Sequence, residues 1–292
     1  MGSLPYQNAH AANVLAFDGV NDHVRKTSFS SGTFAQTRFS VELWFKSDAV
    51  NRGYLVQSAN SSSAYEGEKI QYSMRLEGGG SVVASYGGKG SYVSATSPSS
   101  YGDGNWHHAA MTLASSGLFT LYIDGITVAT DSYSKADDTR YYTLSTYLGV
   151  LTSTRFSNSS YFKGQMRDVR FWSDTRTAAE ILANKDAMLT GAEAGLFAWY
   201  TLDQGVGGGA STSTTSIIDS AGGSNAEPRN FSMGGGTVSN FVPFVDNTPP
   251  TVSGLPASVT LTEDTKGEID LSSALFDDAD GDDQLFSSMQ VI

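Results

Sequence analysis

Short segments in which apolar and polar residues alternate fill most of this chain of 292 residues. The clearest is F-S-V-E-L-W-F-K at 39–46, where Phe39, Val41, Leu43 and Phe45 fall on one face of a strand. Turn-forming residues separate such segments at intervals of roughly 8 to 12 residues, which is typical of antiparallel sheets packed as a sandwich. We expect strands at 13–17, 23–26, 39–46, 53–58, 70–77, 81–86, 106–113, 118–123, 126–131, 142–149, 165–172 and 196–202.

Two local signals add a hairpin and a helix to this pattern. The dipeptide Asp124-Gly125 joins two of the segments and predicts a two-residue turn of type I′. Further along, S-D-T-R-T-A-A-E-I-L-A-N follows the segment that ends at Trp172. Ser173 or Asp174 can cap a helix near 177–189, because a side-chain oxygen there accepts the free N–H groups of a first turn. We therefore predict an all-β fold, with two packed antiparallel sheets and one short peripheral helix.

The composition supports this class and excludes others. Charged residues make up 16% of the chain, and 31 Gly and 14 Tyr accompany many Ser and Thr residues, a balance typical of β-rich proteins. The absence of cysteine excludes a disulfide framework and a thiolate metal site. No apolar run reaches the roughly 18 residues of a membrane span, so we expect no membrane insertion. Residues 1–12 lack the features of a signal peptide; we interpret them as a leader segment within a longer polypeptide.

Negative charge is concentrated toward the C-terminus. The formal net charge is −12, and the last 47 residues, with ten acidic residues and one basic residue, carry −9 of it. The remaining 245 residues carry only −3 and offer no basic surface for a phosphate backbone, which excludes nucleic acid as a partner. The turn-forming run D-N-T-P-P at 246–250 marks a boundary, since a proline pair cannot lie in a central strand. We expect a domain at 13–245, a linker at 246–251 and an incomplete β module at 252–292.

Five motifs occur in an order that one family shares. They are L-A-F-D-G-V-N-D-H-V (15–24), F-S-V-E-L-W-F-K (39–46), N-W-H-H-A-A-M-T (105–112), L-Y-I-D-G (121–125) and F-K-G-Q-M-R-D-V-R-F-W (162–172). With them the chain resembles the concanavalin A-like, laminin G-like jelly-roll modules of bacterial surface proteins. The segment 252–292 resembles the opening half of the cadherin-like or immunoglobulin-like repeats that form stalks in large bacterial adhesins.

The resemblance implies a jelly-roll sandwich in a secreted, extracellular protein of the bacterial cell surface, with neighbouring repeats of the same polypeptide as partners. The implied function is that of a lectin in cell adhesion: non-catalytic, calcium-dependent binding of glycans or glycosylated cell surfaces. A fold hosts many functions, so two alternatives stay open. One is a structural spacer module without its own ligand, and the other, ranked third, is a glycan-active enzyme domain.

An oxygen-rich turn is the first candidate metal site. Asp18, Asn21 and Asp22 lie within five residues, and Gly19 permits a tight bend. Ca²⁺ takes six to eight oxygen ligands, of which such a turn supplies several, although an ordinary Asx turn explains the same residues. The resemblance implies one Ca²⁺ between this turn and the late strand, where Asp168 or the carbonyl of its neighbour Arg167 completes the shell.

The acidic C-terminal segment is the second candidate metal site. Five carboxylates within the seven residues 277–283 repel one another unless a cation or disorder relieves them. An EF-hand is excluded, because Met289 stands at the twelfth position, where that loop requires Glu. The resemblance to cadherin-like repeats implies the Ca²⁺ ligands Glu263, Asp278, Asp280 and Asp282.

Two polar loops that carry tyrosines are the candidates for sugar binding. A tyrosine face suits the apolar face of a sugar ring, and carboxylate, amide and guanidinium groups suit its hydroxyls. The alternative is that these loops are solvated and that their tyrosines pack locally. We predict the ligand-binding residues Tyr65, Glu66, Glu68, Asp137, Asp138, Arg140, Arg155, Asn158 and Tyr161.

Catalytic chemistry is not indicated by the sequence. His107 and His108 point to opposite faces of a strand, so they do not form a zinc or catalytic site together. Retaining glucanases need two carboxylates about 5 to 5.5 Å apart on a rigid frame. Glu66 and Glu68 flank a glycine in a loop, and Glu42 has no acidic neighbour in its strand. We expect a protein that is not an enzyme.

Overall fold

This computed structural model describes residues 13–27, 34, 38–48, 52–59, 70–88, 91–134, 145–151, 160–245, 251–253 and 275–277. In chain order its elements are β1 (Asn13–Asp18), β2 (His23–Lys26), β3 (Phe39–Lys46), β4 (Gly53–Ala59), β5 (Ile70–Leu76), β6 (Ser81–Gly88), β7 (Ser91–Ser100), β8 (Trp106–Leu113), β9 (Leu118–Ile123), β10 (Ile126–Ser132), β11 (Ser145–Leu148), β12 (Lys163–Trp172), α1 (Ala178–Asn184), β13 (Leu196–Tyr200), β14 (Glu227–Arg229), β15 (Asn240–Pro243), β16 (Thr251–Ser253) and β17 (Leu275–Asp277).

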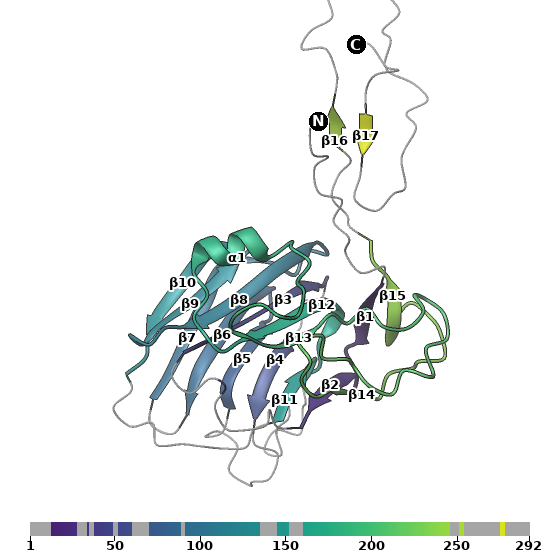
Figure 1. The fold of residues 1–292 in the computed structure, drawn as a ribbon, viewed down its shortest axis with the longest axis horizontal. Helices are drawn as coiled ribbons and strands as arrows, with labels where there is room; N and C mark the ends of the chain where they lie inside the picture. Colours follow the sequence, from purple (N-terminus) through teal and green to yellow (C-terminus); the bar gives the residue numbers. More distant parts are fainter. Residues whose placement is uncertain are drawn as a thin grey trace, which may run out of the picture. The chain divides into compact units, whose positions relative to one another are not determined.

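Two antiparallel sheets form the layers of a sandwich (Figure 1). The eight-stranded sheet has the order β10-β9-β8-β3-β12-β1-β15, with β13 paired to β12, and the seven-stranded sheet has the order β14-β2-β11-β4-β5-β6-β7. Strands that are distant in sequence alternate in both sheets, as in β8-β3-β12-β1, which is the connectivity of a jelly roll. The predicted all-β, two-sheet antiparallel fold is therefore confirmed, and the part of the chain that the structure describes contains one short helix.

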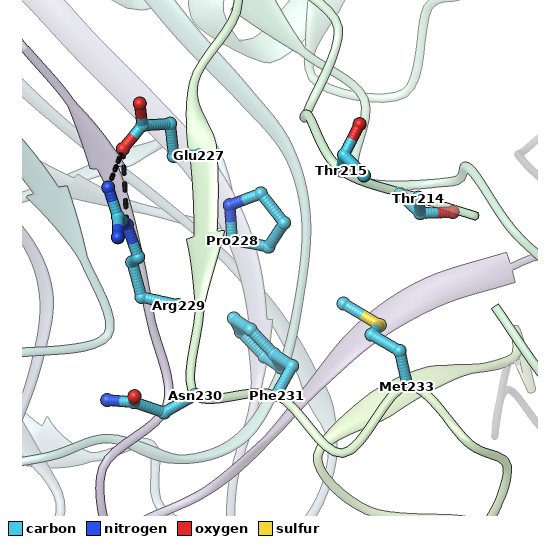
Figure 2. Close-up of a pocket in the computed structure, with 8 residues that line it drawn as sticks. All are labelled: Thr214, Thr215, Glu227, Pro228, Arg229, Asn230, Phe231 and Met233. Carbon is cyan, nitrogen blue, oxygen red and sulfur yellow. Dashed lines mark hydrogen bonds and ion pairs between the residues drawn. The ribbon is translucent and has the colours of Figure 1, made fainter. Parts of the chain in front are cut away.

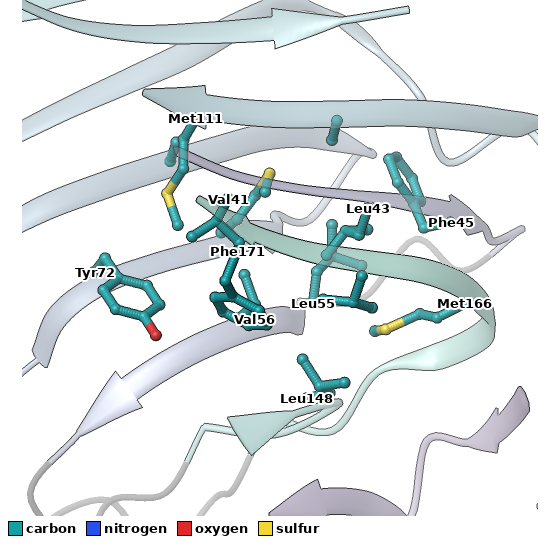
Figure 3. Packing of buried hydrophobic residues seen from close by; sticks show 14 of the residues in the cluster. Val41, Leu43, Phe45, Leu55, Val56, Tyr72, Met111, Leu148, Met166 and Phe171 are labelled. Atoms are coloured by element: carbon teal, nitrogen blue, oxygen red, sulfur yellow. The ribbon is translucent and has the colours of Figure 1, made fainter. Parts of the chain in front are cut away.

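The core lies between the two sheets and is built from inward-facing side chains of alternate residues (Figure 3). The eight-stranded sheet contributes Leu43 and Met166, and the seven-stranded sheet contributes Leu55 and Tyr72, all with at most 1% of their surface exposed. The alternation predicted for β3 is confirmed, since Phe39, Val41, Leu43 and Phe45 all belong to this core.

The outer face of β3 is buried as well, which alternation alone does not predict. Its residues Ser40, Glu42 and Trp44 are at most 8% exposed, because the segment 173–195, which includes α1, covers them. Trp44 Nε1 donates to the carbonyl of Lys185 over 2.9 Å, and Ser40 Oγ donates to the carbonyl of Asp174 over 2.9 Å. The eight-stranded sheet is thus covered on both faces at its centre.

The helix begins later than the cap residues expected from sequence. Thr177 is the N-cap, and it forms a capping box with Glu180: the Thr177 side chain accepts the Glu180 N–H, and Glu180 Oε2 accepts the Thr177 N–H. The prediction of Ser173 or Asp174 as the cap is wrong, because Ser173 continues the chain from β12 and bonds to Gly195 instead. The predicted hairpin at Asp124-Gly125 is present, with positive φ at both residues, as type I′ requires.

Contacts divide the chain into two units, one of which spans Ala9–Phe244 and contains the sandwich. The second contains β16 and β17, which pair with each other in antiparallel register from Thr251↔Asp277 to Ser253↔Leu275. The unit that contains the sandwich ends at Phe244, one residue before the domain end at 245 that was expected from the sequence. Among the described residues no helix has the length and apolar character to cross a membrane.

Candidate functional site

The turn from β1 to β2 brings Asp18 and Asp22 together. Asp18 Oδ1 accepts the backbone N–H groups of Val20 over 2.7 Å and of Asn21 over 3.3 Å, the bonding pattern of an Asx turn. Gly19 at the bend has φ +78°, and a Cβ there would lie 2.8 Å from the Cβ of Lys163. Close approach to β12 therefore makes glycine necessary at this bend.

Asp22 is fully buried at the base of this turn. Its Oδ2 accepts the backbone N–H of Asp18 over 2.9 Å, and its Oδ1 accepts the hydroxyl of Ser239, also over 2.9 Å. Burial raises the pKa of Asp22 to about 6, since desolvation outweighs these two hydrogen bonds. The turn thus holds a desolvated carboxylate beside a second acid, an arrangement that a cation would stabilise.

Asp168 lies away from this turn. In the register of β1 with β12, Asp18 faces Lys163, so Asp168 is five residues further along, about 17 Å at the rise of a strand. Its carboxylate pairs instead with Arg170, with Nε 2.8 Å from Oδ1, and accepts Trp199 Nε1 over 2.7 Å. Among the described residues, no group of three or more His, Cys, Asp or Glu side chains is placed to hold a metal.

The guanidinium of the neighbouring Arg167 packs against three aromatic rings. Its guanidinium carbon lies 4.5 Å from the ring centroid of Trp44, 4.7 Å from that of Phe244 and 5.4 Å from that of Trp106. Such contacts favour a cation over the negative face of each ring. Arg167 therefore packs β12 against Trp44 of β3, Trp106 of β8 and Phe244, which follows β15.

A buried polar network that the sequence analysis missed lies beneath the helix. Arg170, 1% exposed, donates to the carbonyls of Asn184 and Ala187 over 2.8 and 2.7 Å, and to Asp168. Glu42 accepts Trp172 Nε1 over 2.9 Å. The network lies against the C-terminal end of α1, and Arg170 and Glu42 are buried from any substrate. We therefore assign these side chains a structural role. The alternation of β3 placed Glu42 correctly on the outer face, but it carried no signal that Arg170 would meet it.

His107 and His108 face opposite ways, as predicted. His108 Nε2 lies 3.4 Å from Glu42 in the buried network. His107 Nδ1 lies 2.9 Å from Asp124 Oδ2, and its Nε2 lies 3.2 Å from Asp103 Oδ1. Both rings thus have structural partners on separate faces of β8.

Most of the predicted ligand-binding and tail residues lie outside the described part of the chain. They are Tyr65, Glu66, Glu68, Asp137, Asp138, Arg140, Arg155 and Asn158, together with the tail residues Glu263, Asp278, Asp280 and Asp282. The strand ends that flank two of the predicted loops meet, because Ala59 pairs with both Ile70 and Ser145. Tyr161 is described and lies at the other end of β4, where its carbonyl approaches Gly53. It is therefore separated from those strand ends by the length of β4.

The outer face of the seven-stranded sheet carries a second arrangement of polar and aromatic groups. Tyr92, 63% exposed, donates its hydroxyl to Ser85 Oγ over 2.7 Å. Arg75 Nη1 lies 3.4 Å from the same oxygen, and the Arg75 guanidinium lies over the ring of Tyr54, 5.7 Å from its centroid. Ser94 Oγ lies 3.4 Å from Ser85 Oγ. These side chains come from β4, β5, β6 and β7, so they form a row across four neighbouring strands.

Glu77 holds the Arg75 guanidinium of this row in place. Glu77 Oε1 accepts Arg75 Nε over 2.7 Å, and its Oε2 accepts Arg52 Nε over 2.7 Å. Burial by itself raises the pKa of Glu77, but the two arginines outweigh burial and lower it. Burial raises the pKa of Tyr54, so its hydroxyl stays protonated. The row therefore combines tyrosine rings with hydroxyl and guanidinium groups of fixed position, and we call it the tyrosine–arginine row.

The family model described as the concanavalin A-like lectin/glucanases superfamily matches residues 18–182, more than half of the chain. No curated protein matches it. A solved protein from Bacteroides ovatus, to which carbohydrate binding is provisionally ascribed, is similar with a TM-score of 0.54 and 18% identity, over 76% of this chain and 59% of that one. The chain thus spans about three fifths of that relative's length.

Two further solved structures are similar with lower TM-scores. The CBM40 of a Ruminococcus gnavus IT-sialidase, bound to α2,3-sialyllactose, has a TM-score of 0.48 and 12% identity, over 58% of this chain and 95% of that one. Domains LG4-5 of the mouse laminin α1 chain have a TM-score of 0.42 and 17% identity, over 55% of this chain and 41% of that one.

Proposed function

Since the chain belongs to the concanavalin A-like lectin/glucanase superfamily, we propose that its sandwich is a non-catalytic carbohydrate-binding module. The family name covers both binding and hydrolysis, so the side chains must decide between them. The observation that carries the proposal is the tyrosine–arginine row, in which exposed Tyr92 stands beside Ser85 and Arg75 on a rigid sheet.

Sugar recognition needs an apolar face and fixed polar groups side by side. The ring of Tyr92 provides a face that is open to solvent, and its hydroxyl is already oriented by Ser85. Arg75 is held by Glu77, so little side-chain entropy is lost when a ligand hydroxyl meets it. The opposite sheet offers no equivalent at its centre, because the segment 173–195 covers it. Binding therefore belongs on the seven-stranded sheet.

The two carboxylates on the outer face of β3 and β12, Glu42 and Asp168, do not support hydrolysis. Glu42 is 2% exposed and bonded to Trp172, and Asp168 is bonded to Arg170 and Trp199. A retaining hydrolase needs one free acid and one free carboxylate facing the same bond. Neither of these groups is open to a substrate, which favours binding without catalysis.

We further propose that Ca²⁺ stabilises the turn of Asp18, Asn21 and Asp22. Asp22 is a buried carboxylate with a raised pKa, and Asp18 adds a second acid four residues away. Asp168 is not part of this proposal, because Arg170 already neutralises it. Binding of Ca²⁺ to the folded state alone adds about 2.7 kcal/mol at a hundredfold excess over Kd.

Thermal unfolding in Ca²⁺ and in EDTA tests the metal. We expect a higher Tm in Ca²⁺ for the full chain and no Ca²⁺ effect on the sandwich of Asp18→Ala. Asp280→Ala serves as the control for ions held by the acidic C-terminal segment. Identical transitions of the wild-type protein in both conditions contradict the metal proposal.

The wider setting is proposed from the same resemblance. We place the module in a secreted protein of the bacterial cell surface, where neighbouring repeats of the polypeptide present it to glycans or glycosylated cells. Open sites of this kind bind weakly, with Kd of order 0.1 to 1 mM, or roughly 4 to 5.5 kcal/mol. Many copies on one surface would be needed for adhesion.

Beads coated with the full chain and applied to a glycan array test the module. We expect binding of at least one glycan class, lost with Tyr92→Ala and partly kept with Tyr92→Phe, which retains the ring. Ile126→Ala is the matched control, because Ile126 is 66% exposed on β10 of the other sheet. If no glycan on the array is bound, the tyrosine–arginine row is not a glycan-binding site; if the chain also binds no sugar elsewhere, the spacer function replaces the proposal. If Tyr92→Ala binds normally while Tyr65→Ala and Asp138→Ala do not, the site lies in the loops.

A further inference from the structure

A pocket of about 430 Å³ lies between β14 and the segment that contains Thr214 and Thr215 (Figure 2). Pro228 and Phe231 line the side next to β14, the two threonines stand across from them, and Met233 lies below the threonines, across from Phe231. All of these residues follow position 182, so they lie beyond the part of the chain that matches the family model. The volume falls in the lower range of pockets that hold small molecules.

Both walls of the pocket are fixed by the sandwich. Phe231 packs edge-on against Phe17 of β1, with ring centroids 5.2 Å apart. The backbone N–H of Ser211 donates to the carbonyl of Met233 over 2.7 Å, which ties the threonine side to the aromatic side. The Asn230 side chain donates to the carbonyl of Asn21 over 3.0 Å. The pocket is therefore preformed, so that ordering its side chains would cost little of the binding free energy of a ligand.

The lining combines an apolar surface with hydroxyl groups and no net charge. Phe231, Pro228 and Met233 present rings and a thioether, while the hydroxyls of Thr214 and Thr215 have no hydrogen-bond partner within the described part of the chain. The charged lining residues, Glu227 and Arg229, neutralise each other through an ion pair on the far side of β14 (Figure 2). A ligand that fits must be uncharged, with one apolar face and hydroxyls at its edge.

We propose that this pocket binds one neutral pyranose unit, with the apolar face of the sugar on Phe231 and its hydroxyls on Thr214 and Thr215. The inference rests on the proposed carbohydrate-binding function, but it adds a second site separate from the tyrosine–arginine row. A glycan bound by both sites would be held at two points of one module, which raises its apparent affinity if its length spans them.

Methionine methyl groups report on this site in the full chain. Of the seven methionines, Met233 lines the pocket and Met188 is 62% exposed elsewhere, so Met188 serves as the internal control. The chain is labelled with ¹³C-methyl methionine, the Met233 signal is assigned with Met233→Leu, and the methyl glycosides of glucose, galactose and mannose are titrated. Cyclohexanol serves as an apolar ligand of similar ring size.

We expect one glycoside to shift the Met233 signal saturably while the Met188 signal stays in place. Thr214→Val and Thr215→Val should each raise Kd about fivefold, the ratio that corresponds to a net hydrogen bond of about 1 kcal/mol. Both threonines lie near the surface, so these isosteric variants keep the fold.

Three results overturn the inference: no glycoside shifts Met233, both methionines shift in parallel, or cyclohexanol binds as well as the sugars. Tyr92→Ala separates this site from the proposed function. If that variant loses glycan-array binding and keeps the Met233 response, both proposals stand. Array binding without a shift of the Met233 signal rules out only the second site. A shift of the Met233 signal without array binding by the wild-type protein rules out only the tyrosine–arginine row.

Discussion

The guanidinium of Arg170 forms a two-point ion pair with the carboxylate of Asp168, two residues earlier on the same strand. Both side chains lie on the outer face of β12, where a bulge shifts the register with β3 between Arg167 and Arg170 and gives Asp168 a positive φ of +57°. The bulge is what brings the acid, the base and the end of α1 to one point. The ion pair therefore links the local shape of β12 to the covering of the eight-stranded sheet.

Replacing Arg170 should destabilise the sandwich strongly. Arg170→Met leaves the carboxylates of Asp168 and Glu42 buried without their cation, a loss of about 3 to 5 kcal/mol in the free energy of unfolding. Arg52→Met is the control, because Arg52 pairs with Glu77 but is half exposed, and exposed pairs contribute less than about 1 kcal/mol. Urea unfolding followed by tryptophan fluorescence measures both. Equal losses for the two variants would show that the buried pair has no special role.

The position of the helix cap gives a second prediction. Thr177→Ala removes the side-chain oxygen that accepts the Glu180 N–H, and it should lower stability by about 1 kcal/mol. Ser173→Ala, at the cap position first expected from the sequence, should have a smaller effect because it bonds only to the carbonyl of Gly195. The same urea experiment compares them, and the reverse order of effects would move the cap back to Ser173.

His107 should make stability depend on pH above neutrality. Burial by itself lowers its pKa, but Asp124 and Asp103 outweigh burial and raise the pKa above 6.5. A group whose folded pKa is raised stabilises the protein fully below its unfolded pKa, and that contribution is lost as pH rises through the folded value. Stability measured from pH 6 to pH 8.5 should fall less in His107→Gln than in the wild-type protein.

His23→Gln is the matched control for this experiment. Burial lowers the pKa of His23, the opposite direction from His107, so its removal should not lessen the fall in stability as pH rises. If His107→Gln and the wild-type protein show the same slope, the two carboxylates do not bind a protonated His107.

Asp22 should make the stability of the protein depend on pH in the acidic range. Its pKa is about 6 in the folded protein against an ordinary value of 3.8 for an aspartate exposed to water, so the folded chain holds this proton more tightly than the unfolded chain. Its contribution to stability therefore decreases as pH rises from about 3.8 to about 6. Asp22→Asn, which keeps the size of the side chain, should remove this decrease in unfolding experiments in EDTA. An unchanged pH profile in that variant contradicts the assignment.

The sequence predicts most clearly what depends on neighbouring residues. The inward face of β3 followed from simple alternation, and the β9–β10 hairpin followed from Asp124-Gly125, because only these residue types adopt the required φ angles readily. β7 (Ser91–Ser100) was not expected, since its serines and threonines give a weak apolar pattern. It forms because Val93 and Ala95 reach the core through pairing with β6.

The candidate sites depend on contacts between distant residues, which composition does not reveal. The tyrosine–arginine row needs the pairing of four strands before Tyr54, Arg75, Ser85 and Tyr92 become neighbours. Asp18 and Asp22 were found from sequence because they share one turn, whereas Asp168 was placed with them by resemblance and pairs with Arg170 instead. A signal for that pairing was present in the D-V-R spacing, which puts an acid and a base on the same face of a strand.

The pairing of β1 with β15 has a mechanical consequence. Asn13, where the chain enters the sandwich, lies opposite Pro243, where it leaves. Tension along the polypeptide would therefore pull on one end of a single antiparallel pair and open its hydrogen bonds one after another, as a zipper opens, rather than shearing them all together. The force would bypass the other strands until that pair had opened. The strands of the seven-stranded sheet, which carry the tyrosine–arginine row, lie outside this pair, so the row would keep its shape while the pair opens.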